Sequence, residues 1–93
     1  MEKLDICKML ALSTAHITEE TADLLWNNAV GLVVYEKPGH EGCFVLVCNW
    51  TENQKYVPDD LRACLELAAA HNCDWLNLDR DADVVSLLPA YEW

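Results

Sequence analysis

Apolar residues fall at even spacing in several short runs of the chain, which is the pattern of strands with at least one buried face. One run, CFVLVCNW, is apolar on both faces, as is typical of a central strand, and it places Cys43, Val45 and Val47 on the same side. We expect strands at residues 4–13, 31–36, 43–50 and 74–78.

Two further segments carry apolar residues at helical spacing, with start and stop residues at their ends. In the first, Thr18 is a suitable N-cap, two glutamates follow where the helix dipole favours anions, and Gly31 is the expected stop. The second helix opens around Pro58, which a first turn tolerates, and closes at residues 71–72. Its buried stripe is expected to consist of Leu61, Cys64, Leu65 and Ala68.

The elements follow the order β-α-β-β-α-β, and residues 84–93 form an apolar tail. This order predicts a single α+β domain over residues 1–93. The expected architecture is a ferredoxin-like sandwich, in which an antiparallel sheet carries both helices on one face, plus the C-terminal tail. No stretch is long enough for a signal peptide or a membrane span, so we expect a cytoplasmic protein without membrane contact.

The chain combines an apolar content of 53% with a formal net charge of −10. The apolar content excludes an intrinsically disordered chain. The acidity excludes direct binding to nucleic acid, which requires clustered Lys and Arg. Residues 57–93 hold eight acidic and two basic side chains. We expect the second helix and the turn after the last strand to form a negative surface, with Asp59, Asp60, Glu66, Asp79, Asp81 and Asp83 as its carboxylates.

This acidity has two interpretations. Dispersed carboxylates keep a small protein soluble, whereas carboxylates gathered in a patch can occupy a basic groove built for nucleic acid. Aromatic side chains would anchor a partner beside such a patch, and Trp50 and Tyr56, on or beside a polar loop, are the candidates. Trp75 is expected in the core.

Ser13 and His16 precede the first helix, and a hydroxyl near an imidazole is one component of a nucleophile–base pair. Hydroxyls before a helix more often serve as caps, so we expect no catalytic site and no enzyme. The acidic turn at residues 79–83 resembles the opening of a calcium loop. Val84 and Ala90, however, stand where that loop needs Gly and Glu. We therefore expect neither a metal site nor a cofactor.

The five cysteines are odd in number and show no C-x-x-C spacing, which argues against a disulfide framework. Because most lie in apolar runs, we expect reduced thiols that pack in the core. His71 and Cys73 form one close pair, and a structural zinc site needs two.

Four separated motifs occur together: S-T-A-H-I-T at 13–18, H-N-C-D-W at 71–75, D-R-D at 79–81 and L-P-x-Y-x-W at 88–93. On these motifs the chain resembles domain-of-unknown-function family 5983, small proteins of bacterial mobile elements and phages, from Ser13 to Trp93. Ala82 departs from the Gly that usually follows D-R-D in the family. The family has no established activity, so the resemblance implies a genomic context rather than a mechanism.

That context and the acidity together favour an inhibitor of a host defence system, of anti-CRISPR or anti-restriction type, acting in the host cytoplasm. Its expected partner is a basic nucleic-acid-binding protein or a CRISPR effector subunit, bound by nucleic-acid mimicry. The alternative is a small enzyme or ligand-binding domain that uses Ser13, His16 and the Asp79–Asp83 turn, which a cleft joining these residues would favour. A third interpretation is a homodimer that pairs its exposed aromatic residues and apolar tail across a two-fold axis.

Overall fold

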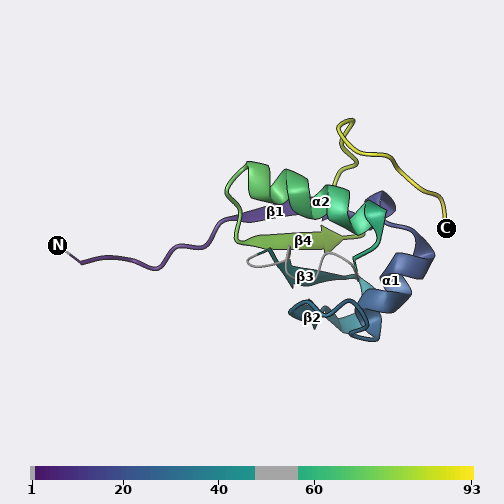
Figure 1. Cartoon of the computed structure of the whole chain (residues 1–93), viewed down its shortest axis with the longest axis horizontal. Helices are drawn as coiled ribbons and strands as arrows, with labels where there is room; N and C mark the ends of the chain where they lie inside the picture. The colour runs from purple at the N-terminus through teal and green to yellow at the C-terminus, as the bar shows by residue number, and fades with distance from the viewer. Residues whose placement is uncertain (1, 48–56) are drawn as a thin grey trace.

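The predicted order of elements is confirmed in the computed structural model, which describes residues 2–47 and 57–93 (Figure 1). The end of the predicted 43–50 strand, with Trp50, and Tyr56 in the following loop lie outside the described residues. The elements are β1 (Met9–Ser13), the 3-10 turn η1 (Thr14–His16), α1 (Glu19–Trp26), β2 (Val34–Glu36), the 3-10 turn η2 (Pro38–His40), β3 (Gly42–Leu46), α2 (Asp59–Ala70) and β4 (Trp75–Asp79).

The four strands form one mixed sheet in the order β1-β4-β3-β2. The β2–β3 pair is antiparallel, as expected of the predicted hairpin, and β3–β4 is a second antiparallel pair. By contrast, β1 runs parallel to β4, with Leu12 opposite Leu78. The all-antiparallel, ferredoxin-like sheet is therefore not the one that forms. The pairing of β1 with β4 begins at Asp74, whose Oδ2 accepts from the Lys8 amide at 2.8 Å while its own amide donates to the Lys8 carbonyl at 2.7 Å. One residue of the H-N-C-D-W motif thus aligns the starts of both strands.

The strand predicted from residue 4 begins only at Met9. Residues 2–8 are exposed and extend away from the rest of the domain in Figure 1. The residues Leu4 and Ile6 are 66% and 81% exposed. The reason is the length of the partner, since Met9 is already paired with Trp75, the first residue of β4. Periodicity alone cannot reveal where a neighbouring strand starts.

The core lies between one face of the sheet and the helices. Leu12, Val45, Leu76 and Leu78 point into it from the strands and are at most 1% exposed. The helical stripe predicted for α2 is confirmed, since all four of its members are fully buried. Figure 1 shows α2 lying along β1 and β4, whereas α1 lies beside the end of the sheet at which β4 ends. The start of α2 also lies near this end of the sheet, because α2 packs against η1, the turn that follows β1.

The start of α1 is confirmed and its end is earlier than expected. Thr18 caps the helix by accepting from the Thr21 amide at 3.2 Å. The chain leaves the helix at Asn28, whose φ of 54° is left-handed, and the Ala29 amide then donates to the Leu24 carbonyl at 2.8 Å. Asparagine tolerates this conformation, so Asn28 takes the terminating role expected of a glycine.

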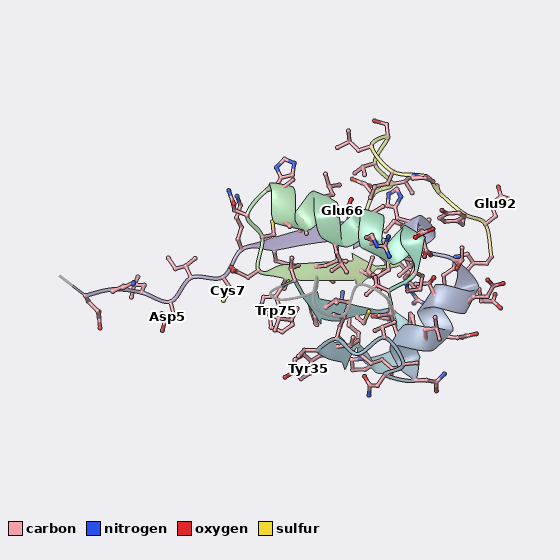
Figure 2. The ribbon with its side chains drawn as sticks, viewed as in Figure 1. Asp5, Cys7, Tyr35, Glu66, Trp75 and Glu92 are labelled. Atoms are coloured by element: carbon pink, nitrogen blue, oxygen red, sulfur yellow. The ribbon has the colours of Figure 1, made fainter. Side chains whose placement is uncertain are left out.

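The opposite face of the sheet carries the aromatic pair labelled in Figure 2. The rings of Tyr35 and Trp75 lie 5.9 Å apart between centroids, and the Lys37 ammonium lies 4.8 Å from the centroid of Phe44. Trp75 alternates with the buried Leu76, so it faces away from the core, and its expected core position is wrong. Along the described ranges, no helix has both the length and the apolar character needed to cross a membrane.

Candidate functional site

A cavity of about 530 Å³ lies where the parallel strands β1 and β4 end. Sites at the carboxyl ends of strands are common in sheets with parallel pairs, and this volume falls within the range of small-molecule pockets. Four separate segments contribute its lining, which consists of Ser13, Thr14, Ala15, Ala22, Asp23, Trp26, Arg80, Tyr91 and Trp93.

Ser13 ends β1 and caps the short turn η1 at the edge of the cavity. Its Oγ accepts from the Ala15 amide at 3.1 Å, and the residue is 5% exposed. This is the capping role that a hydroxyl before a helical turn commonly takes. Thr14 and Ala15 follow within the turn and complete this wall.

His16 is almost fully buried, at 1% exposure, and both of its ring nitrogens bond to the tail. The Val85 amide donates to Nε2 at 3.0 Å, and Nδ1 lies 2.8 Å from the Pro89 carbonyl oxygen. Because Nε2 accepts, the proton belongs on Nδ1, which donates to Pro89. The two nitrogens are thus engaged in holding backbone, and His16 does not form the suggested nucleophile–base pair with Ser13.

Two further bonds place the tail against the start of α1. The Tyr91 amide donates to the Ala15 carbonyl at 2.7 Å, and the Trp93 indole Nε1 donates to the Ile17 carbonyl at 2.9 Å. In Figure 1 the yellow tail rises past α2 and turns back toward α1. These contacts bring the aromatic rings of the L-P-x-Y-x-W motif to the cavity, and Tyr91 also borders a smaller cavity of about 220 Å³ at the start of α2.

The D-R-D turn supplies the basic side chain of the cavity. The Arg80 amide donates to the Glu41 carbonyl at 3.0 Å, and its guanidinium Nη2 lies 3.4 Å from Glu41 Oε1. Asp79 builds the turn, since Oδ1 accepts from the Asp81 amide at 2.9 Å and Oδ2 pairs with Lys37 Nζ at 3.1 Å. The amide bond first, and Lys37 second, hold the pKa of Asp79 below its usual value.

Asp79→Asn should remove part of the acid sensitivity of the fold. A carboxylate with a lowered pKa stabilises the folded state above its unfolded pKa and loses that contribution as the pH falls through the folded value. The urea midpoint of the wild type should therefore fall, relative to Asp79→Asn, below about pH 4. Asp81→Asn, which changes an exposed neighbour and keeps the amide that donates to Asp79, is the control and should keep the wild-type dependence of the urea midpoint on pH. If the urea midpoints of the wild type and Asp79→Asn changed in the same way with pH, the Asp79 carboxylate would not have this stabilising role.

The predicted acidic residues separate into structural and exposed ones. Asp60 joins the starts of the two helices, since Oδ2 accepts from the Thr18 amide at 2.7 Å and Oδ1 accepts from the Thr21 hydroxyl at 2.8 Å. Its neighbour Asp59 has a 97% exposed side chain, 3.6 Å from Arg62. Glu66, visible on α2 in Figure 2, is exposed, as are Asp81 and Asp83. Four of the six carboxylates therefore face solvent, while Asp60 and Asp79 serve the fold.

Asp60→Ala should lower the free energy of unfolding by about 2 kcal/mol, because two donors at the start of α1 lose their acceptor. Asp59→Ala is the matched control and should change stability by about 1 kcal/mol or less, since it removes an exposed ion pair and one exposed carboxylate from the first turn of α2. Urea unfolding followed by circular dichroism measures both. Equal losses in the two variants would refute the bridging role of Asp60.

The described cysteines offer no reactive thiol near the cavity. Burial raises the pKa of both Cys43 and Cys64 to about 12, so these thiols stay protonated at neutral pH. Cys73 is buried too. Cys7 is exposed, so the core position expected of the cysteines is wrong for this one. Within residues 2–47 and 57–93, no three His, Cys, Asp or Glu side chains are grouped to hold a metal ion.

The sequence motifs contained some of the cavity residues but did not show that these residues line the same cavity. Arg80, Tyr91 and Trp93 lie inside two of the recognised motifs, and Ser13 begins a third, so three of the four motifs border one cavity. Asp23 and Trp26 carried no such indication, since both belong to an ordinary amphipathic helix.

The sequence matches the C-terminal domain of the family of unknown function DUF5983 over residues 9–93. That range contains every strand and helix described above. No curated protein and no solved structure matches it. The chain therefore belongs to the DUF5983 family, in the part of the family represented by its C-terminal domain.

Proposed function

We propose that this domain binds a small ligand in the cavity at the ends of β1 and β4. One observation carries the proposal: three motifs far apart in the sequence line a single cavity of about 530 Å³. Pockets for small molecules combine apolar and aromatic walls with a few polar groups, and this lining follows that composition. The aromatic residues Trp26, Tyr91 and Trp93 supply the walls, and hydroxyl and charged side chains supply the polar groups.

Binding, rather than catalysis, is supported by the roles of the candidate nucleophile and base. Ser13 Oγ accepts a capping bond, and both nitrogens of His16 hold the tail. Catalysis by such a pair needs the base within hydrogen-bond reach of the nucleophile. The hydrogen bonds of Ser13 and His16 therefore favour ligand binding over catalysis at this cavity.

The test is a titration of ¹⁵N-labelled protein with small aromatic fragments, namely indole, phenol and benzoate. Amide and indole resonances of the lining residues should shift, and Trp93→Ala should weaken binding at least fivefold because stacking area is lost. Leu87→Ala is the matched control, an exposed apolar residue of the same tail that does not line the cavity. Fragment-induced shifts confined to other surfaces, or none at all, would refute the proposal.

A second candidate function rests on the exposed carboxylates of α2 and of the turn after β4. With a net charge of −10, their exposure supports salt-sensitive binding to a basic protein, such as a nucleic-acid-binding component of a host defence system encountered by a mobile element. In this second function the domain would act as an inhibitor that contacts its partner through Asp59, Glu66, Asp81 and Asp83.

Affinity capture from host lysate at low and high salt tests this second function. A variant with Asp59, Glu66 and Asp81 changed to Lys should lose the partners that high salt removes. A variant with Glu19 and Glu20 changed to Lys is the control, because these exposed acids lie on α1, outside the proposed surface. Recovery of the same partners by the first variant would exclude the inhibitor mechanism.

A further inference from the structure

The residues that line the cavity include one acidic and one basic residue, among others that are aromatic, small or hydroxyl-bearing. Arg80 contributes to the lining from the turn after β4, and Asp23 contributes from α1. They are the two charged residues of the nine that line the cavity. A ligand complementary to these walls needs a planar ring together with groups of both charges.

Both charged residues lie at accessible positions. The side chain of Arg80 is 58% exposed, and its contact with Glu41 is a 3.4 Å pair between two half-exposed groups, which contributes little and is easily exchanged. Asp23 is also exposed. The bonds that tie it to the end of α1 use its main-chain carbonyl, which accepts from the Asn27 amide at 3.1 Å and from Asn27 Nδ2 at 2.8 Å.

The overall charge of the protein further limits the net charge of the ligands that the cavity can bind. At a net charge of −10, the field around the domain opposes the approach of a simple anion and attracts cations without selecting among them. A neutral zwitterion carries no such penalty and engages both side chains. Arginine binds a carboxylate through two parallel donors, and an aspartate accepts from an ammonium group.

We propose that the cavity binds an aromatic zwitterion: a free aromatic amino acid or a short peptide with an aromatic residue. This inference rests on the proposed ligand-binding function and names its substrate class. Arg80 receives the carboxylate, Asp23 receives the ammonium group, and the ring lies against Trp26 and Trp93. Offset or edge-to-face ring contacts of this kind add selectivity for planar side chains.

Three indole probes separate the contributions of the two charges. L-tryptophan carries both, indole-3-propionate lacks the ammonium group, and tryptamine lacks the carboxylate. By calorimetry and ¹⁵N-resolved titration, L-tryptophan should bind at least tenfold more tightly than either analogue, because each analogue leaves one charged side chain without its partner. Glycyl-tryptophan, in which the charges stand farther apart, identifies the source: tighter binding indicates a peptide, and weaker binding a free amino acid.

Two variants assign the charges to residues. Arg80→Gln should abolish the preference for L-tryptophan over tryptamine, while Asp23→Asn should abolish the preference over indole-3-propionate. A loss of structure would instead lower the affinity for all three probes together. Glu41→Gln is the control, since it removes only the exposed partner of Arg80 and should leave both preferences in place.

The outcomes distinguish this inference from the function on which it rests. Equal binding of the three probes in the cavity would overturn the zwitterion and keep the ligand-binding function. The same holds if neutral fragments shift the lining resonances and L-tryptophan does not. If neither the fragments nor the indole probes shift these resonances, both proposals are wrong.

Discussion

Gly42→Ala is expected to destabilise the domain by about 4 kcal/mol or more, a large share of the stability of a small domain. Gly42 pairs with Asp79 at the start of β3 and has a φ of 147°. A Cβ atom there would lie 1.8 Å from the carbonyl oxygen of Leu78 and 2.8 Å from its carbonyl carbon. These are backbone atoms of the central strand β4, so the clash is relieved only by separating the two strands. Urea unfolding followed by circular dichroism measures the loss.

Gly39→Ala is the matched control for this prediction. Gly39 also has a positive φ, of 75°, but its nearest neighbour would be the flexible side chain of Glu41 at 3.8 Å. Only the conformational cost of about 1 kcal/mol remains there. If both variants lost the same amount of stability, the close approach of β3 to β4 would not be the cause.

His16→Ala should release the C-terminal tail and lower the free energy of unfolding by about 3 kcal/mol. The imidazole is almost fully buried, and its loss leaves the Val85 amide and the Pro89 carbonyl without their partner. Hydrogen exchange of the Val85 and Tyr91 amides should accelerate by at least tenfold, while amides in α2 respond only to the global loss of stability.

His71→Ala is the control for the tail, because the His71 side chain is exposed at the end of α2. Its carbonyl, which accepts from Lys8 Nζ, is retained in the variant. Unchanged protection of the Tyr91 amide in His16→Ala would mean that the tail is held by other contacts. Because Tyr91 and Trp93 wall the cavity, His16→Ala should also abolish fragment binding.

Local sequence patterns predict the helices of this domain well. The stripe of α2 and the cap at Thr18 depend on residues within a few positions of each other, and the structure confirms both. The partner of β1 is a different matter, because it depends on the contact between Lys8 and Asp74, 66 positions apart. The hydrophobic pattern of β1 suits a strand beside any neighbour, so the sequence did not reveal the parallel β1–β4 pair, and the predicted antiparallel sheet was wrong.

The candidate site shows the same division between local and distant information. Asp59 and Asp60 are chemically identical neighbours, yet only Asp60 meets the start of α1. His16 was suggested as a base from its place near Ser13, but its bonds to Val85 and Pro89 come from the far end of the chain. The sequence therefore contained the motifs that line the cavity, but only the three-dimensional fold shows that they lie together.

The most direct test of the ligand-binding account is the measurement of intermolecular nuclear Overhauser effects between bound indole and the alanine methyl groups of the protein. Ala15 in η1 and Ala22 in α1 line the cavity, whereas Ala63 lines the smaller cavity at the start of α2. The account predicts effects from the indole ring to Ala15 and Ala22. Effects to Ala63 or other methyl groups, with none to Ala15 and Ala22, would contradict it.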